Sequence, residues 1–277
     1  MPPTPDEQAL IERFSTTYQR LTSSETMLDI ERAVCGCDYG CTSWTRRDEA
    51  DLAAGLLNLS PGVDLLDIGS GSGWPGLYLA KESGCNVTLT DLPLEGLEVA
   101  KRRAEEDAMV DRCVITQADG AALPFKSASF DAIFHSDVLC CLIKKQAVLE
   151  SCRRVVRGDG QNGGRMVFSV ILIAPDLTEA DYALAADGGP TFIETDIPYP
   201  EMLKRAGWTI AGHTDLTADY FATFRKMYEL EQANEEELIR VHGEDGAQAL
   251  LERRKATLVP IEMGLLRREL FSVAPAG

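Results

Sequence analysis

The sequence predicts a doubly wound α/β fold built on a mostly parallel sheet. Between residues 64 and 173, short apolar segments alternate with amphipathic segments of helical length. A glycine-rich turn follows the first apolar segment, in VDLLDIGSGSGWPG at 63–76, and an acidic residue, Asp91, ends the second. Strands separated by helices of this length pair in parallel through right-handed crossovers, so the alternation indicates the doubly wound class.

Each expected strand is a short apolar or alternating segment bounded by turn residues. The expected strands cover residues 64–68, 86–90, 113–117, 129–135, 165–173, 208–216 and 269–273. Helices are expected where apolar residues recur every three or four positions. These segments are 6–19, a short helix ending near 33, 47–59, 74–83, 94–108, 144–156, 201–206 and one or two helices over 219–256. The acidic segment 175–200 is expected to be irregular.

Composition excludes several classes of protein. The chain has 277 residues and a net charge of −17, which repels nucleic acid backbones and anionic membrane surfaces. It has no apolar run near the roughly 18 residues of a membrane span, and its first residues do not resemble a secretory signal. The eight cysteines are then expected to be reduced thiols. We expect a cytoplasmic protein without nucleic acid or membrane partners.

The glycine-rich turn matches two patterns that indicate different cofactors. Gly69, Gly71 and Gly73 form G-x-G-x-G, whereas G-x-G-x-x-G, the dinucleotide pattern, uses Gly76 as its last glycine. Asp67, two residues before the first glycine, would repel a pyrophosphate and suits a cationic, amino-acid-bearing ligand. A further acidic residue follows the third strand, and the chain ends in a strand, a helical insert and a strand. These features favour the first pattern over an NAD-dependent oxidoreductase.

With these motifs the sequence resembles the class I S-adenosylmethionine (SAM) dependent methyltransferases of small-molecule type. The matching motifs are LLDIGSGSG (65–73), LTDLP (89–93), QADGAALPF (117–125), SFDAIFHSDVL (129–139) and GRMVFSV (164–170). The resemblance implies a Rossmann-like, mostly parallel seven-stranded sheet. It implies an N-terminal helical cap over 1–59 and a SAM-binding methyltransferase domain over 60–277, with a helical insert at about 217–260.

The resemblance also implies roles for single residues toward SAM. Asp67 would order the glycine loop and the amino group, and the three glycines would pass close to the methionine moiety. Asp91 would hold the ribose hydroxyls and Leu92 would pack on the adenine. The remaining expected SAM contacts are Asp119 and Gly120 at the adenine, Ser136 at the methionine part, and Tyr18 and Trp44 as covers from the cap.

Methyl transfer needs alignment and exclusion of water more than a dedicated catalytic group, and a general base is optional. His135 and Asp137 are the candidates for proton transfer or substrate contact, because they end the fourth strand. Backbone hydrogen bonding by the histidine and helix capping by the aspartate are the structural alternatives. Phe221, Phe224 and Tyr228 recur on one helical face, and an aromatic lining in an acidic chain would favour a cationic or amine substrate.

Three cysteines, Cys35, Cys37 and Cys41, lie in a turn-rich segment that has few apolar residues to bury and is expected to be loosely held. No structural metal is expected, because a closed zinc site needs four ligands. Cys140 and Cys141 follow the cofactor-facing strand. The predicted function is transfer of a methyl group from SAM to an N, O or S atom of a small molecule. The alternatives are a thiophilic acceptor such as arsenite, and a SAM-binding interaction module without turnover.

Overall fold

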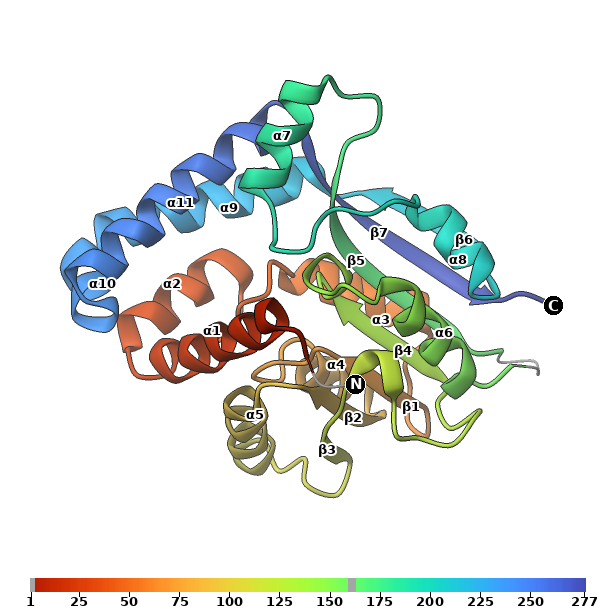
Figure 1. Ribbon diagram of the computed structural model, residues 1–277. Coiled ribbons are helices and arrows are strands. Elements are labelled where there is room, and N and C mark those ends of the chain that lie inside the picture. The colour runs from red at the N-terminus through yellow and green to blue at the C-terminus, as the bar shows by residue number, and fades with distance from the viewer. Residues whose placement is uncertain (1–2, 159–162) are drawn as a thin grey trace.

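The structure, a computed structural model, describes residues 3–158 and 163–277 (Figure 1). Within these residues the chain forms a seven-stranded sheet in the order β3-β2-β1-β4-β5-β7-β6. Strand β7 runs antiparallel to β5 and β6, and the other neighbouring strands pair in parallel. The predicted fold class, a mostly parallel seven-stranded sheet, is therefore confirmed.

The strands are β1 (Asp64–Ile68), β2 (Asn86–Asp91), β3 (Cys113–Gln117), β4 (Ala132–Ser136), β5 (Arg165–Ile173), β6 (Trp208–Asp215) and β7 (Leu266–Pro275). The helices before β5 are α1 (Pro5–Leu21), α2 (Glu25–Cys35), α3 (Arg47–Leu57), α4 (Gly76–Ser83), α5 (Leu94–Glu106) and α6 (Lys145–Val155). Those after β5 are α7 (Glu179–Gly188), α8 (Tyr199–Arg205), α9 (Thr217–Ala233), α10 (Glu235–His242) and α11 (Glu244–Glu262). Two short 3-10 helices are η1 (Gly120–Ala122) and η2 (Leu139–Cys141).

The sheet separates two apolar cores, because successive side chains of a strand point to opposite faces. On β1, Leu66 packs in the core beneath α6 and α8, and Leu65 packs in the core beneath α3 and α4. Both side chains are fully buried. The same alternation decides which residues at the carboxyl end of each strand reach the site.

Helices from both ends of the chain meet beyond the carboxyl ends of the parallel strands (Figure 1). Helix α2 contacts α9, and α1 contacts α10, so the N-terminal helices and the insert α9–α11 cover the same region. None of the helices in the described part of the chain is both long and apolar enough to cross a membrane. The division into a cap over 1–59 and a second domain over 60–277 stays a prediction.

Two expectations about local structure were wrong. The segment 175–200 is not irregular throughout, because it contains helix α7. Thr178 caps that helix by accepting the Asp181 N–H at 3.2 Å, and acidic residues stand in its first turn, which stabilises a helix N-terminus. The insert forms three helices rather than one or two, with breaks at Asn234 and Gly243.

A buried guanidinium, that of Arg268 on β7, joins the sheet to helix α3. Its Nε donates to both carboxylate oxygens of Asp137 at 3.0 Å, and its Nη1 donates to Glu49 on α3 at 2.7 Å. Its Nη2 donates to the hydroxyls of Thr45 and Ser169, at 3.2 and 3.1 Å. Arg268 has 0% of its surface exposed, so the pairing with two acidic side chains is what makes the buried charge tolerable.

Replacing this arginine is expected to destabilise the protein. Arg268→Gln leaves Asp137 and Glu49 buried without their cation, a change that costs about 3–5 kcal/mol in buried pairs. Arg267→Gln, one residue earlier and half-exposed, should change the free energy of unfolding by less than about 0.5 kcal/mol. Chemical denaturation of both variants measures the difference, and equal stabilities would contradict the role given to Arg268.

Candidate active site

A cavity of about 520 Å³ lies where the N-terminal helices, the carboxyl ends of β1, β2 and β4, and the insert meet. This volume is within the range of small-molecule sites. The sheet contributes the glycine loop and the ends of β2 and β4, the N-terminal segment contributes Tyr18 and residues 41–44, and the insert contributes α9 and α11. The cavity therefore combines segments that are distant in the sequence.

The glycine loop turns tightly beneath Tyr18. Gly71 has φ +51°, and a Cβ placed there would collide with the Tyr18 hydroxyl. The Gly71 N–H donates to the Asp91 carboxylate at 2.8 Å, and the Leu92 N–H donates to it at 2.7 Å. Burial nevertheless raises the pKa of Asp91 to about 6. The loop, Tyr18, Asp91 and Leu92 thus line the cavity together, and their roles toward SAM stay a prediction.

Polar groups beside this loop are buried without partners. Asp67 Oδ2 and the hydroxyls of Ser70 and Ser72 have no hydrogen bond to any part of the chain that the structure describes. Burial, and then the charge of Asp91, raise the pKa of the Asp67 carboxyl well above its usual range. All three residues line the cavity. Unsatisfied polar atoms are costly in a protein interior, so their position points to a polar ligand. A Cβ at Gly76 would collide with Asp67 Oδ2, which explains the second glycine pattern without a dinucleotide.

Ser136 joins the end of β4 to the N-terminal segment. Its hydroxyl lies 2.5 Å from the Thr45 hydroxyl and 3.4 Å from that of Ser43. The Trp74 indole, beside the glycine loop, donates to the Thr45 carbonyl at 2.8 Å. Ser136 and Ser43 are in the cavity wall, so the predicted residue Ser136 is brought to the site by the strand that carries it.

His135 is not in the cavity wall, and the geometry argues against its predicted role in proton transfer. Alternation along β4 places Phe134 and His135 on opposite faces of the sheet. The imidazole is fully buried, stacks on Phe168 with ring centroids 4.7 Å apart, and bonds through neither nitrogen to the described residues. Burial lowers the pKa of His135 to about 3, so the ring is a neutral part of the core.

Asp137 lines the cavity, but its carboxylate is engaged. Both oxygens accept from Arg268, and Ser169 donates to Oδ1 at 3.2 Å. Its backbone has φ +54°, the left-handed region that aspartate tolerates better than most residues. A carboxylate held in this way is a poor general base. The contacts therefore argue against proton transfer by Asp137, and its carboxylate instead binds Arg268 at the cavity wall.

Asp119 and Gly120 are not brought into the cavity wall. Asp119 caps η1 by accepting the Ala121 N–H at 2.9 Å. Gly120 is buried against Ile68, where a Cβ would lie 3.3 Å from the isoleucine side chain. Their role at the adenine stays a prediction from the family motif.

Aromatic side chains form the opposite end of the cavity. Trp44 stacks on Phe224 at 4.6 Å and meets Tyr220 edge-on at 5.8 Å. The wall of α9 consists of Tyr220, Phe224, Met227 and Glu231 rather than the predicted set 221, 224 and 228. Steps of four and three residues, from Tyr220 to Phe224 and then to Met227, place these side chains on one face of the helix. This face begins at residue 220, whereas the sequence pattern began at 221.

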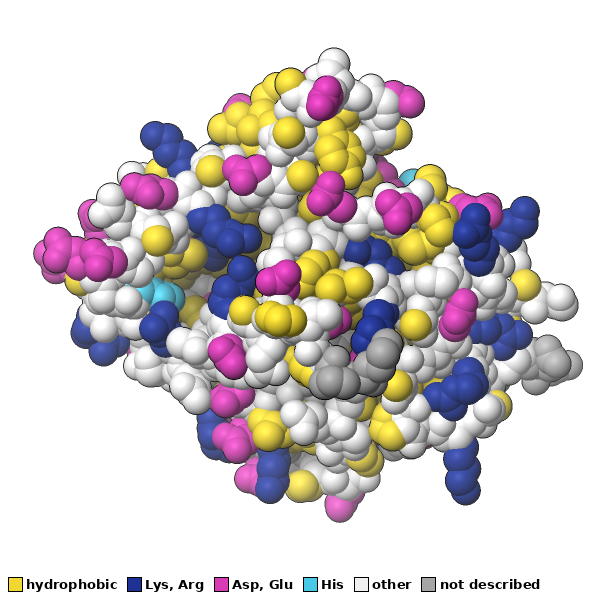
Figure 2. Space-filling model, viewed as in Figure 1, with side chains coloured by type: hydrophobic (Ala, Val, Ile, Leu, Met, Phe, Trp, Pro, Cys, Tyr) yellow, Lys and Arg dark blue, Asp and Glu magenta, His cyan; other side chains and the backbone are white. Residues whose placement is uncertain are grey.

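An arginine lies at this aromatic end and two more line the cavity, which does not fit the expected cationic substrate. The Arg254 guanidinium lies over Trp44 at 5.0 Å and pairs with Glu231 at 2.9 and 3.0 Å. Arg13 on α1 and Arg253 on α11 also line the cavity, and neither forms an ion pair with residues 3–158 or 163–277. Partial burial and then the Arg253 charge lower the pKa of Arg13. Figure 2 shows basic side chains around a hollow between the α11 and α1 regions.

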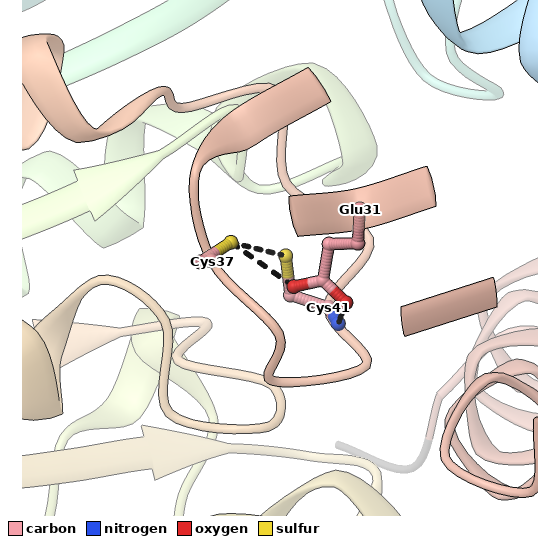
Figure 3. A group of neighbouring side chains, drawn as sticks. All are labelled: Glu31, Cys37 and Cys41. Carbon is pink, nitrogen blue, oxygen red and sulfur yellow. Dashed lines mark hydrogen bonds between the residues drawn. The ribbon is translucent and has the colours of Figure 1, made fainter. Parts of the chain in front are cut away.

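The cysteine segment is better held than expected, because a residue outside it, Glu31 on α2, organises it (Figure 3). Glu31 accepts the N–H groups of Tyr39, Gly40 and Cys41 at 3.0, 2.7 and 3.3 Å. Composition alone missed these bonds, since they join a helix to a loop. The sequence signal for these bonds is a glutamate, Glu31, that shortly precedes a segment rich in turn residues.

Comparisons with known proteins agree with the fold. A family profile described as a methyltransferase domain matches residues 66–162. Methyltransferase GfsG of Streptomyces halstedii is 28% identical over 166 residues, 58% of this chain and 58% of that protein. The 27-O-demethylrifamycin SV methyltransferase of Amycolatopsis mediterranei (strain S699) is 34% identical over 125 residues, 45% of this chain and 44% of that protein. The crystal structure of the cyclase SpnF covers 100% of this chain and 99% of its own, with TM-score 0.76 and 19% identity.

The profile over residues 66–162 and these relatives support the prediction, made from the motifs, of a class I SAM-dependent methyltransferase. It spans about half the length of the two curated relatives that it matches. The likeness to SpnF extends over the whole chain and concerns the fold.

Removing the imidazole of His135 tests whether it acts in the site. His135→Phe keeps a ring against Phe168 and removes two unpaired nitrogens, which should raise the free energy of unfolding by about 1 kcal/mol. Since the ring is outside the cavity, ligand affinity and turnover should not change. A tenfold loss of either in a variant of normal stability would restore His135 as a functional residue.

Proposed function

We propose that this protein transfers a methyl group from SAM to a small-molecule acceptor that occupies the aromatic end of the cavity. The single observation that carries the proposal is that one cavity joins the glycine loop and Asp91 to the chamber around Trp44 and Phe224. A donor and an acceptor can therefore meet in one cavity. The eight free cysteines fit a reducing compartment, and we place the enzyme in the cytoplasm.

The residues of the glycine loop fit SAM. Asp91 is available for ribose hydroxyls, and Leu92 presents an apolar surface for the adenine. Asp67, Ser70 and Ser72 present the unpartnered polar atoms that the amino-acid part of SAM would satisfy. Gly69 and Gly71 line the cavity without side chains, so a ligand can approach the backbone there, whereas Gly73 packs against Leu77 and Ala100. Tyr18 and Trp44 would close over the ligand from the N-terminal segment.

When bound, SAM supplies an activated methyl group on a sulfonium. The chain itself aligns the acceptor and excludes water, which is where most of the rate enhancement of such a displacement arises. Trp44, Tyr220 and Phe224 provide the apolar wall for this. With His135 in the core and Asp137 paired to Arg268, we assign no general base, and the acceptor would lose its proton to water or ionise before the transfer.

The acceptor that best suits the chamber is partly apolar and carries an anionic group. Arg13 and Arg253 line the cavity with side chains that are also exposed to solvent, and neither forms an ion pair in the described chain, although the protein as a whole is strongly acidic. A carboxylate or phosphate between them would relieve their mutual repulsion and form charge-assisted hydrogen bonds. We leave N, O and S open as the acceptor atom.

A thiophilic acceptor such as arsenite is the second candidate, because Cys41, Cys140 and Cys141 all line the cavity. Hydrogen bonding from Cys140 lowers the pKa of the Cys141 thiol, which favours binding of a soft ion. A third reading is SAM binding without turnover, since the cyclase SpnF shares the fold and the fold alone does not determine the reaction.

Binding of S-adenosylhomocysteine should be micromolar and pH-dependent. The ionised Asp91 accepts the ribose hydroxyl bonds, and its pKa in the free protein is about 6. Affinity should therefore fall as the pH drops through 6, and be about tenfold weaker at pH 5 than at pH 7. Isothermal titration calorimetry across this range measures the effect.

Asp91→Asn is the matched control for that titration. It should weaken binding by about 1–3 kcal/mol and remove the pH dependence. A pH step that persists in the variant would assign the titration to Asp67 instead. Tight binding of NAD without binding of S-adenosylhomocysteine would overturn the proposed function.

Methyl transfer to paired acceptors tests the substrate class. Aromatic carboxylic acids should be methylated in preference to their amides, and Arg13→Gln with Arg253→Gln should lower kcat/KM by about tenfold or more. The double arginine variant should bind S-adenosylhomocysteine with unchanged affinity. The control variant Lys255→Gln, which changes an exposed residue on α11, should alter neither this affinity nor kcat/KM. Methylation of arsenite but of no organic acceptor would select the second candidate, and no turnover on any acceptor would favour the third.

A further inference from the structure

Two thiols and a carboxylate converge beside the cavity. The Cys37 and Cys41 sulfurs lie 3.9 Å apart, and Cys37 Sγ lies 3.0 Å from Glu31 Oε1. One ligand atom from each of the three residues lies within 4.8 Å of the others. Figure 3 shows the two sulfur atoms turned toward each other and toward the carboxylate. Glu31 and Cys41 are also in the cavity wall.

The separation of the sulfurs matches that of two ligands on one metal ion. Two thiolates at about 2.3 Å from a tetrahedral zinc ion are about 3.8 Å apart. A thiolate and a carboxylate oxygen on such an ion are about 3.6 Å apart, so Cys37 and Glu31 would separate by about 0.6 Å when an ion replaces the thiol proton between them.

The charge of Glu31 also favours a cation. The side chain is only 5% exposed, and it forms no ion pair with any residue that the structure describes. Buried carboxylates in proteins are generally paired with a cation or bound to a metal. Three backbone N–H groups and one thiol are the partners that Glu31 has here. A bound cation would neutralise the carboxylate while leaving the backbone bonds in place.

We propose that Glu31, Cys37 and Cys41 form a binding site for a thiophilic divalent cation of the zinc type in the wall of the cavity. The cysteine spacing does not reveal this site, because the third ligand comes from helix α2. Three protein ligands leave one tetrahedral position for water or another ligand, as in zinc sites that are not purely structural. Glu31 and Cys41 also border the cavity.

Binding balances as a proton exchange. The two thiols lose their protons and become thiolate ligands, so one divalent cation enters and two protons leave, with no change of oxidation state. The affinity should therefore increase with pH.

Cadmium is the probe for this site, because its thiolate complexes absorb in the ultraviolet and zinc is spectroscopically silent. The reduced full-length protein is titrated with Cd²⁺ in the presence of a non-thiol reductant and followed by absorbance and calorimetry. We expect one ion per chain, release of two protons, and displacement of Cd²⁺ by excess Zn²⁺.

Cys37→Ser and Cys41→Ser should each weaken binding by about tenfold to 100-fold. Cys113→Ser, which alters a partly buried thiol on β3, is the matched control and should bind normally.

Three results would overturn the proposal: no stoichiometric Cd²⁺, equal affinity in the Cys37→Ser, Cys41→Ser double variant, or loss of binding only when Cys140 and Cys141 are replaced. Thermal unfolding and binding of S-adenosylhomocysteine establish that each variant is folded. Because the titration uses the metal alone, its outcome is independent of whether methyl transfer is ever observed.

Discussion

The buried charge of Arg268 is the constraint on which the site depends. Its guanidinium lies between Asp137 at the end of β4, Ser169 on β5 and two residues of the N-terminal segment, Thr45 and Glu49. One side chain thus sets the position of the cap relative to the sheet. Burial raises the pKa of Glu49 even beside this cation, which indicates how costly the arrangement is for the acidic partners. Such a network stabilises one specific geometry rather than adding net stability.

That geometry divides the cavity into two ends with different chemistry. At the sheet, unpartnered acidic and hydroxyl groups surround the glycine loop, and the raised pKa values of Asp67 and Asp91 reflect their burial. At the insert, aromatic rings and arginines prevail. The first end suits a cationic sulfonium compound with polar substituents, and the second an apolar anion. The reaction would take place between them, where the cap closes the space.

The cap is therefore more than a cover. Glu31 holds residues 39–41, Thr45 reaches both Ser136 and Arg268, and Tyr18 lies against Gly71. The contact of Glu31 lies within the N-terminal segment, whereas those of Thr45 and Tyr18 join this segment to the sheet and to the glycine loop. The proposed cation site lies in the same segment, so a bound metal would add a further constraint on it.

The sequence by itself determined the fold class, the family and the glycine loop with Asp67 and Asp91, because these depend on local patterns: strand alternation, a tight turn and motif order. It could not decide which face of β4 carries the site, and so it put His135 forward for proton transfer. It also did not reveal that Asp137 pairs with Arg268. It also missed Arg268, Glu31 and the arginines of the chamber. These depend on contacts between residues far apart in the chain, such as Arg268 with Glu49. Burial, charge pairing and side-chain direction arise only when the strands and helices pack together, and the tertiary structure alone decides them.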